Sequence, residues 1–161
     1  MSQSDVERRG FWYTLPDLDD VRIPVNRADF QKLSRLRIKE AKALLDGGLY
    51  SGAYYLAGYA VECALKACIA KLTKEHDFPD REVVNKSWSH RLSQLVEVAG
   101  LEKERNEKAR LDKEFELRWG LVKDWNEDSR YGSASEKKAR QLYDAIADPT
   151  YGVLQWLEQR W

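Results

Sequence analysis

Residues Tyr50–Leu72 read YSGAYYLAGYAVECALKACIAKL, and they are the strongest indication of how this chain folds. The stretch is almost wholly apolar apart from Glu62 and Lys66, which lie four positions apart and therefore share one face of a helix. So apolar a run predicts a buried helix. Burial of an ion pair is costly unless both charges are well partnered. We therefore expect Glu62 and Lys66 either to hold a buried junction together or to line a site.

The composition suits one soluble domain with a substantial core. The chain has 161 residues, and its 27 Lys and Arg balance 27 Asp and Glu. A net charge of zero argues against strong nonspecific attraction to nucleic acid or to an anionic membrane, although a local basic patch is compatible with it. Six Trp and eight Tyr predict a thick core, a large interface, or both.

Cys63 and Cys68 are the two cysteines of the chain. A spacing of five places them about 140° apart around a helix, which suits neither a disulfide nor a shared metal. We interpret them as small core residues of a protein in a reducing compartment. Glu62, Lys66 and the tyrosines argue against a membrane span, and the N-terminal residues contain no apolar signal region. These features predict a cytoplasmic protein without metal or cofactor.

Two regions of different character divide the chain. Residues 1–26 contain FWYTLPDLDDVRIPV, with three consecutive aromatics and two prolines, and lack helical periodicity. We expect an extended arm that packs on its own domain or on a second subunit. Residues 27–161 contain repeated helical patterns and no convincing strand. They predict an all-α fold, an antiparallel bundle of four to five helices.

The periodicity and the capping signals predict the helices of this bundle. The expected segments are Asn26 or Asp29 to about Leu45, Tyr50 to about Lys74, a helix capped by Ser89 up to Gly100, Lys103 to Trp125, and a last helix opened by SASE at Ser133–Glu136 with a restart at Asp148-Pro149. Residues 75–88 are expected to form a loop. In the first helix Arg37 is the polar exception on an apolar stripe.

The segment Trp125–Tyr131, WNEDSRY, is a candidate ligand site. Arg130 next to a helix start is a natural position for binding phosphate, and Tyr131 has a ring on which a base can stack. The structural alternative is that Arg130 pairs with Asp128 or a capping carboxylate while Tyr131 fills the core.

His90 is a candidate base because it stands near a predicted helix N-terminus, where the neutral imidazole is favoured. The alternative is a capping or core-edge histidine. His76 and Asp77 do not suggest a metal site, since no cysteine is nearby and His90 is the only other histidine. The available side chains fit metal-independent RNA cleavage better than most chemistries, because the RNA 2′-OH is itself the nucleophile.

At the level of motifs, KEAKALLDGGLYSGAYYLAGYAVECALKACIAKL followed by SHRLSQLVEVAG resembles the HEPN superfamily (higher eukaryotes and prokaryotes nucleotide-binding domain). The shared elements are A-x-x-L-L, a Tyr/Ala-rich helix with an A-V-E-x-A-L-K core, and a His-x-Leu-x-x-Leu helix start. The resemblance covers roughly Arg35–Trp161. It implies a bundle of four or five helices that usually forms a homodimer.

The resemblance also implies a function. Many members are toxins or defence proteins encoded beside a minimal nucleotidyltransferase, and the catalytic members are metal-independent ribonucleases with Arg, four to six residues, then His in a late helix. No histidine follows Arg130 here. Glu62 and Lys66 match the E-x-x-x-K core, and Arg130 stands where the motif is expected.

From this combination we expect a dimeric module of a toxin-antitoxin or defence-type system that binds nucleotide or RNA through Glu62, Lys66, Arg130 and Tyr131. One alternative is a metal-independent ribonuclease toxin that uses His90 with Arg130. Another is a structural partner of a nucleotidyltransferase.

Overall fold

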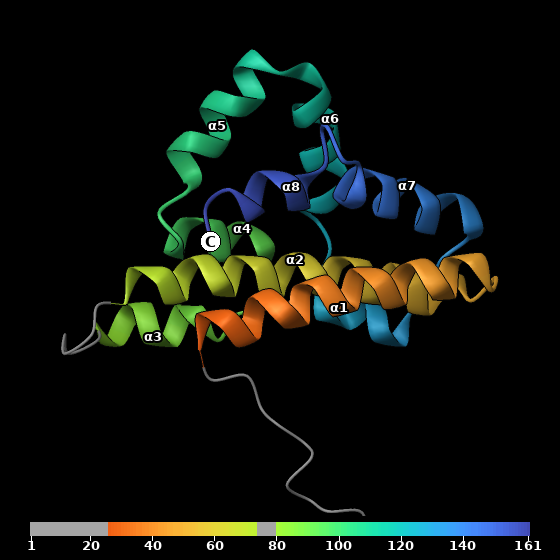
Figure 1. Cartoon of the computed structure of the whole chain (residues 1–161), viewed down its shortest axis with the longest axis horizontal. Helices are drawn as coiled ribbons and strands as arrows, with labels where there is room; N and C mark the ends of the chain where they lie inside the picture. Colours follow the sequence, from red (N-terminus) through yellow and green to blue (C-terminus); the bar gives the residue numbers. More distant parts are fainter. Residues whose placement is uncertain (1–25, 74–79) are drawn as a thin grey trace, which may run out of the picture.

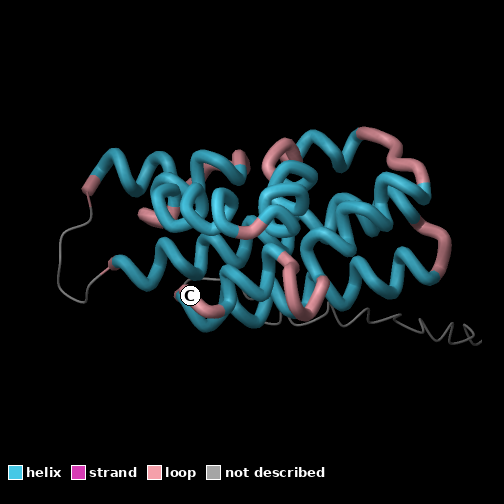
Figure 2. The backbone as a smooth tube through the Cα atoms, turned by 90° about the horizontal axis from the view of Figure 1, so that it is seen from above, coloured by secondary structure: helices cyan, strands magenta, loops and turns pink. Residues whose placement is uncertain are grey.

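The structure, a computed structural model, describes residues 26–73 and 80–161. These residues form eight α-helices and one short 3₁₀ helix, and they contain no strand (Figure 2). The elements are α1 Arg27–Asp46, α2 Tyr50–Leu72, α3 Arg81–Ser87, α4 Leu92–Val98, α5 Glu102–Leu111, α6 Lys113–Val122, η2 Glu127–Tyr131, α7 Glu136–Ala147 and α8 Val153–Glu158. The predicted all-helical bundle is therefore confirmed.

Helices α1 and α2 form a long hairpin and lie side by side (Figure 1). Asn26 caps α1 by accepting a hydrogen bond from the Asp29 amide at 3.0 Å, as one of the two predicted caps. Gly48, with φ of 74°, makes the turn, because this left-handed conformation is cheap only for glycine. The hydroxyl of Ser34, a fully buried residue of α1, donates to the Ala60 carbonyl of α2 at 2.8 Å.

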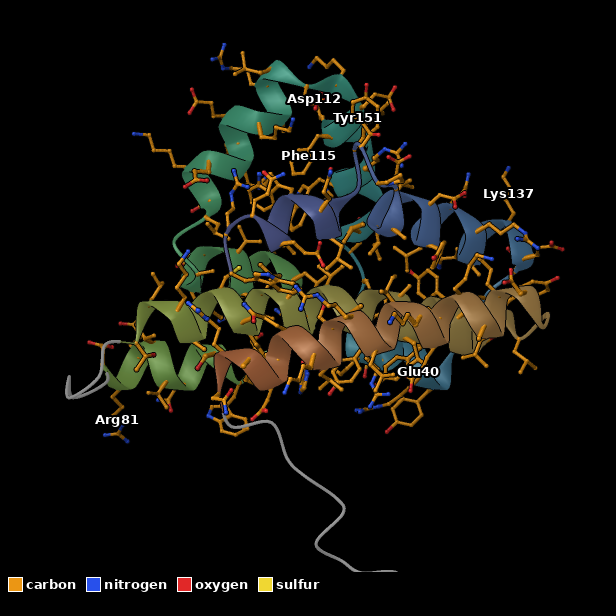
Figure 3. All side chains as sticks on the ribbon, in the orientation of Figure 1. Glu40, Arg81, Asp112, Phe115, Lys137 and Tyr151 are labelled. Carbon is orange, nitrogen blue, oxygen red and sulfur yellow. The ribbon has the colours of Figure 1, made fainter. Side chains whose placement is uncertain are left out.

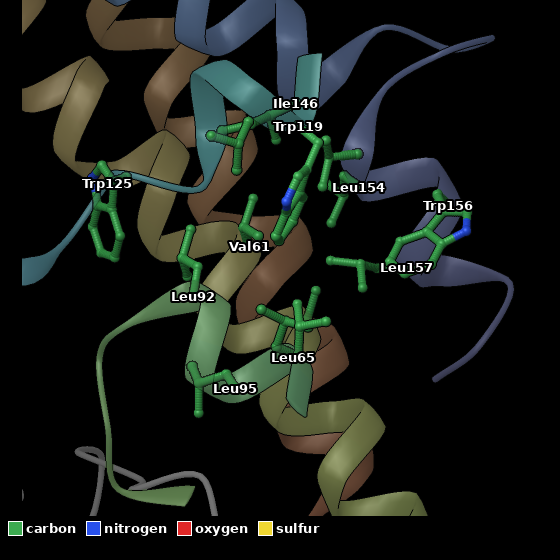
Figure 4. Close-up of a cluster of buried hydrophobic side chains, with 14 of the residues drawn as sticks. Val61, Leu65, Leu92, Leu95, Trp119, Trp125, Ile146, Leu154, Trp156 and Leu157 are labelled. Carbon is green, nitrogen blue, oxygen red and sulfur yellow. The ribbon is translucent and has the colours of Figure 1, made fainter. Parts of the chain in front are cut away.

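Helix α2 is the centre of the core. It packs against α1, α4, α7, α8 and η2, so its apolar side chains are covered on several sides (Figure 4). Its own Val61 and Leu65 are surrounded by large side chains of the other elements, namely Leu92, Leu95, Phe115, Trp119, Val122, Ile146 and Leu157. The prediction that Tyr50–Leu72 forms one buried helix is confirmed by this packing.

The segment before α4 differs from the prediction. Part of the expected loop at residues 75–88 is helix α3, capped by Asp80, whose carboxylate accepts from the amides of Glu82 and Val83. Ser89 does not cap α4 directly. Its hydroxyl accepts from the Arg91 amide, and α4 begins one residue later. Asp80 is a strong capping residue, and it starts a helix that the weak apolar periodicity of this segment does not reveal.

The predicted single helix from Lys103 to Trp125 is two helices. Asp112, in extended conformation with φ −129° and ψ 101°, ends α5 and caps α6 by accepting from the Phe115 amide at 3.1 Å. Periodicity did not reveal this break, because charged residues precede Asp112 and no glycine or proline marks it. The break turns α6 back toward the core, while α5 rises away from α2 (Figure 1).

The last two helices start later than predicted. Ser135, not Ser133, is the cap of α7 and accepts from the Lys138 amide. Asp148 accepts from the amides of Thr150 and Tyr151, and so it closes a turn instead of opening a helix. Helix α8 begins only after Gly152.

The arm predicted for residues 1–26 lies outside the described residues, except for Asn26. His76 and Asp77 lie outside them as well. Within the described part of the chain, every helix is too short or too polar to cross a membrane.

Candidate functional site

Glu62 is the centre of a polar cluster in the middle of α2. Its side chain is 1% exposed, yet it is a carboxylate among alanines, valines and leucines. Its Oε1 accepts hydrogen bonds from Lys66 Nζ at 2.9 Å and from His90 Nδ1 at 3.0 Å. The structure thus brings together three residues that the sequence singled out. Two positively polarised partners on one oxygen offset part of the cost of burying the carboxylate.

The hydrogen bond to Glu62 fixes how His90 is presented. Because a carboxylate only accepts, Nδ1 of His90 carries a proton, and in the neutral ring Nε2 has the free lone pair. The His90 side chain is 45% exposed, compared with 15% for Lys66. His90 is therefore the member of the cluster that can meet a ligand from solvent, and Glu62 orients it.

Burial, together with the charge of Glu62, raises the pKa of two neighbours on α2. Burial, followed by the charge of Glu62, raises the pKa of the Cys63 thiol to about 12. Burial, followed by Cys63 and Glu62, raises the pKa of Tyr59 to about 12. Both groups stay protonated near neutral pH, so neither a thiolate nor a phenolate is available there as a nucleophile.

Arg37 of α1 lies beside the same cluster. Its guanidinium carbon is 5.8 Å from the centre of the Tyr59 ring, and its Nη1 forms an ion pair with Glu40. Two buried polar atoms of this region have no hydrogen-bond partner among the described residues, namely Arg37 Nε and Glu62 Oε2. Arg37, the one polar residue on the apolar stripe of α1, thus places its positive charge against the ring of Tyr59 on α2.

An aromatic row continues from Tyr59 toward η2. The rings of Tyr59 and Tyr55 stack with centroids 6.1 Å apart and planes 11° apart, and Tyr55 lies 5.9 Å from the ring of Trp125. Both tyrosines are half-buried, whereas Trp125 is buried. Trp125 can lie this close to α2 because of Gly58, where a Cβ atom would stand 2.3 Å from the indole.

Arg130 and Tyr131 stand at the far end of this row. The guanidinium carbon of Arg130 is 4.9 Å from the Tyr131 ring centre, and the charge interaction between Arg130 and Tyr55 places it near the row. Tyr131 is 80% exposed, so it does not fill the core. Within the described part of the chain Arg130 forms no ion pair within 4.0 Å. The structural alternative for this segment is therefore wrong on both points.

We call the α2 face the group of side chains arranged around the buried Glu62: Arg37, Tyr55, Tyr59, Lys66, His90, Arg130 and Tyr131, with Glu62 beneath them. Figure 1 shows α3 and the segment around η2 beneath the α1–α2 pair, on the side opposite α7 and α8. Arg130 is not in contact with Glu62; the two tyrosines lie between them. The sequence analysis missed Arg37, Tyr55 and Tyr59. Two features of the sequence could have indicated them: Arg37 is a polar residue on an apolar stripe, and Tyr55 and Tyr59 are four positions apart and so share one face of a helix.

A cavity of about 640 Å³ lies elsewhere, between the end of α2, the α4–α5 turn and the C-terminal residues. Cys68 lies on its wall, and burial raises the pKa of this thiol to about 11. Arg160 faces the cavity but already binds Glu104 through Nε at 2.8 Å and the Trp156 carbonyl through Nη1 at 2.7 Å. In the part of the chain that the structure describes, His, Cys, Asp and Glu do not gather into a group of three that could hold a metal ion.

The protein is a helical bundle whose central helix α2 carries the buried Glu62, which binds Lys66 of the same helix and the more exposed His90. The sequence model of the HEPN domain matches residues 32–159, which is most of the chain. The chain therefore belongs to the HEPN domain family, a class of helical modules related to nucleotides and RNA. No curated protein and no solved structure matches it.

Proposed function

We propose that this protein is a nucleotide- or RNA-binding HEPN module and that its ligand lies on the α2 face. The observation that carries the proposal is the pairing of Arg130, a cation without an ion pair among the described residues, with the exposed ring of Tyr131 next to the stacked Tyr55 and Tyr59. A guanidinium offers several donors in the geometry of a phosphate, and tyrosine rings stack on bases.

Arg37 and His90 add positive or polarised groups along the same face, and this matches a ligand longer than one phosphate. Because the net charge of the chain is zero, the protein as a whole does not attract an anionic ligand. Binding therefore depends on the positive groups of the α2 face. We therefore expect modest affinity that falls as salt rises, because phosphate contacts release counterions.

The test is fluorescence anisotropy with a labelled single-stranded RNA, with a labelled ATP analogue as a second probe. Arg130→Ala should weaken binding roughly ten-fold, since a hydrogen bond to a charged group is lost. Tyr131→Ala should weaken RNA binding by a similar factor through lost stacking.

Arg140→Ala is the matched control, because Arg140 is a half-exposed arginine of α7 paired with Glu136 at 2.8 Å. It should leave the affinity unchanged. Equal affinity of wild type, Arg130→Ala and Tyr131→Ala for both probes would remove the α2 face as the binding site.

A second candidate function is a metal-independent ribonuclease, favoured by the orientation of His90. A buried carboxylate holding Nδ1–H leaves Nε2 as a proton acceptor, and this is the arrangement of a general base. The family's Arg–His motif is absent, so in this candidate His90 takes the 2′-OH proton and the 2′-oxygen attacks the phosphorus. The bond from phosphorus to the 5′-oxygen breaks, the 5′-oxygen takes up a proton from water, and Arg130 stabilises the charge on the phosphate. Cleavage in the presence of a chelator, lost in His90→Ala and reduced in Glu62→Gln, is the expected outcome. Clean wild-type protein that leaves several RNAs intact contradicts it.

We also propose the setting in which the protein works: a cytoplasmic homodimer of a toxin-antitoxin or defence-type system, beside a nucleotidyltransferase partner. The family resemblance supports this setting, as does helix α5, which is highly charged and has no buried residue. Co-purification of the tagged protein with a nucleotidyltransferase encoded beside it is the test. Residues 1–26 are proposed as an arm distinct from the bundle at 27–161.

A further inference from the structure

A polar hollow of about 340 Å³ lies between the start of α4 and the segment that joins α6 to η2. We call it the α4–η2 hollow. The residues that line it are Arg91, Ser93, Lys123, Asp124, Trp125, Asn126, Glu127 and Asp128. Its volume falls within the range of about 300–1,000 Å³ that small-molecule sites occupy in proteins.

The polar groups of this hollow are left without partners. Among the described residues, its two cations and three carboxylates form no ion pair within 4.0 Å. Trp125 is 2% exposed and stands at the edge of the core cluster (Figure 4), yet its Nε1 has no hydrogen-bond partner in the described part of the chain. A buried donor without an acceptor is costly, and a ligand in the hollow can supply the acceptor.

The α4–η2 hollow adjoins the α2 face. Trp125 on its wall lies 5.9 Å from the ring of Tyr55, which belongs to the tyrosine row. Glu127 on its wall and Arg130 of the α2 face belong to the same short helix, η2. A nucleotide held on the α2 face therefore has the hollow within reach of a base.

The charges of the hollow decide which part of a nucleotide it takes. Three carboxylates against two cations disfavour a phosphate there. A nucleobase is neutral and presents donors and acceptors on its edges. The hollow offers the complement of both, because its carboxylates accept hydrogen bonds, whereas Arg91, Lys123 and the Trp125 indole donate them.

Guanine matches these groups better than the other bases do. Its N1–H and N2–H₂ are adjacent donors that fit the two oxygens of one carboxylate, and its O6 and N7 are adjacent acceptors that fit a guanidinium. Adenine and cytosine have one donor group beside ring acceptors, and uracil has one N–H between two carbonyls. A carboxylate opposite any of these three bases therefore meets an acceptor as well as a donor.

We propose that the α4–η2 hollow is a guanine-selective base site. This inference rests on the proposed function, the binding of nucleotide or RNA on the α2 face. Glu127 is the half-buried carboxylate of the three, and it accepts from N1–H and N2–H₂ of guanine. Arg91, which directly precedes α4, donates to O6 and N7, so the base is held between two elements. Contacts to phosphate give affinity for any sequence, and this site adds the preference for guanine.

Fluorescence anisotropy with labelled short oligouridine RNAs tests the proposal. The RNAs carry guanosine, adenosine, cytidine or inosine at one central position. Wild-type protein should bind the guanosine RNA about ten-fold more tightly than the adenosine and cytidine RNAs, which is the discrimination that one bidentate base contact provides. Inosine lacks the N2 amino group and should lose most of this preference. These comparisons use the wild-type chain alone, so they do not depend on whether a variant folds.

Two variants assign the contacts to residues. Glu127→Gln should weaken binding of the guanosine RNA about ten-fold and leave the adenosine RNA unchanged, since only guanine uses both carboxylate oxygens. With 7-deazaguanosine, which lacks N7, wild type should bind about three-fold more weakly than with guanosine, whereas Arg91→Ala should not distinguish the two. Glu107→Gln is the matched control, because Glu107 is an exposed carboxylate of α5 outside the hollow. It should change neither affinity.

Several outcomes would overturn the guanine site. They are equal affinity of wild type for the guanosine, adenosine and inosine RNAs, tighter binding of another base, and a loss in Glu127→Gln that is the same for every RNA. If RNA binding still depends on Arg130 in these cases, the proposed function stands without the base site. Absence of binding to every RNA also overturns the guanine site, and the proposed function is then decided by the ATP analogue.

Discussion

At the scale of single residues, the Glu62 carboxylate shows what a local pattern can and cannot predict. The four-residue spacing of Glu62 and Lys66 predicts their contact, because the helix alone brings them together. The contact with His90 joins residues 28 positions apart and depends on how α4 docks on α2. No periodicity encodes that distance.

The buried thiols give a prediction about pH. Below pH 9 the thiols of Cys63 and Cys68 are protonated in both the folded and the unfolded chain. Above it the unfolded chain loses these protons first, since folding raises their pKa values from 9.0 to about 12 and about 11. The unfolded state then binds fewer protons, so the free energy of unfolding falls as pH rises, by about 1.4 kcal/mol per thiol between pH 8 and 10.

Urea denaturation at pH 8, 9 and 10 measures this fall. In Cys63→Ala the free energy of unfolding should fall less between pH 8 and pH 10 than in wild type, by the contribution of one thiol. This difference does not depend on how stable the variant is at pH 8. A slope identical to that of wild type would contradict the assignment. Iodoacetamide at pH 8 should modify neither cysteine until the protein is unfolded.

At the scale of secondary-structure elements, the residue type at position 58 is explained by the close approach of two segments and not by helix propensity. The chain between α6 and η2 crosses α2 where Trp125 lies over Gly58. The sequence indicates a helix through Gly58 but gives no reason for the glycine. The reason is an indole that comes from 67 positions further along the chain.

Gly58→Ala should therefore lower the free energy of unfolding by about 2–3 kcal/mol or more, because the new methyl group overlaps the Trp125 ring. Gly120→Ala is the matched control, because a Cβ atom at this position of α6 would meet nothing within 4 Å. It should raise the free energy of unfolding by about 0.5–1 kcal/mol. Urea denaturation of both variants at low protein concentration makes the comparison. Similar stabilities of the two variants would show that Trp125 does not occupy this position.

The break between α5 and α6 at Asp112 also depends on contacts with other elements. Asp112 is favoured as a cap for α6, and Lys108 on α5 pairs with it at 2.6 Å, so the residue serves both helices. In the sequence it stands inside a charged run that also fits one continuous helix. The core contacts of Phe115 and Trp119 favour the broken arrangement, because a straight helix would carry these side chains away from α8.

At the scale of the whole molecule, stability is concentrated around α2. This helix contacts five other elements, whereas α3 and α5 have no buried residue. Figure 3 shows Asp112 at the top of the α5–α6 corner and Arg81 at the outer end of α3, both remote from the core.

Amide hydrogen exchange should follow this distribution. The middle of α2, from Ala57 to Cys68, should exchange slowest and only through global unfolding, while α3 and α5 should exchange through local opening many times faster. Mass spectrometry of exchange over minutes to days measures the difference. Equal protection of α5 and α2 would show that α5 is covered in solution by a partner.

Local patterns were sufficient to predict the all-helical class, the buried run Tyr50–Leu72 and the family, because helical periodicity and the E-x-x-x-K core can be recognised within one segment. Three contacts could not be predicted and became known from the folded arrangement: His90 with Glu62, Arg37 with Tyr59, and Arg130 at the end of the tyrosine row. The physical reason is that these contacts join separate helices. Their geometry follows from how the core packs, and packing is a property of the whole chain.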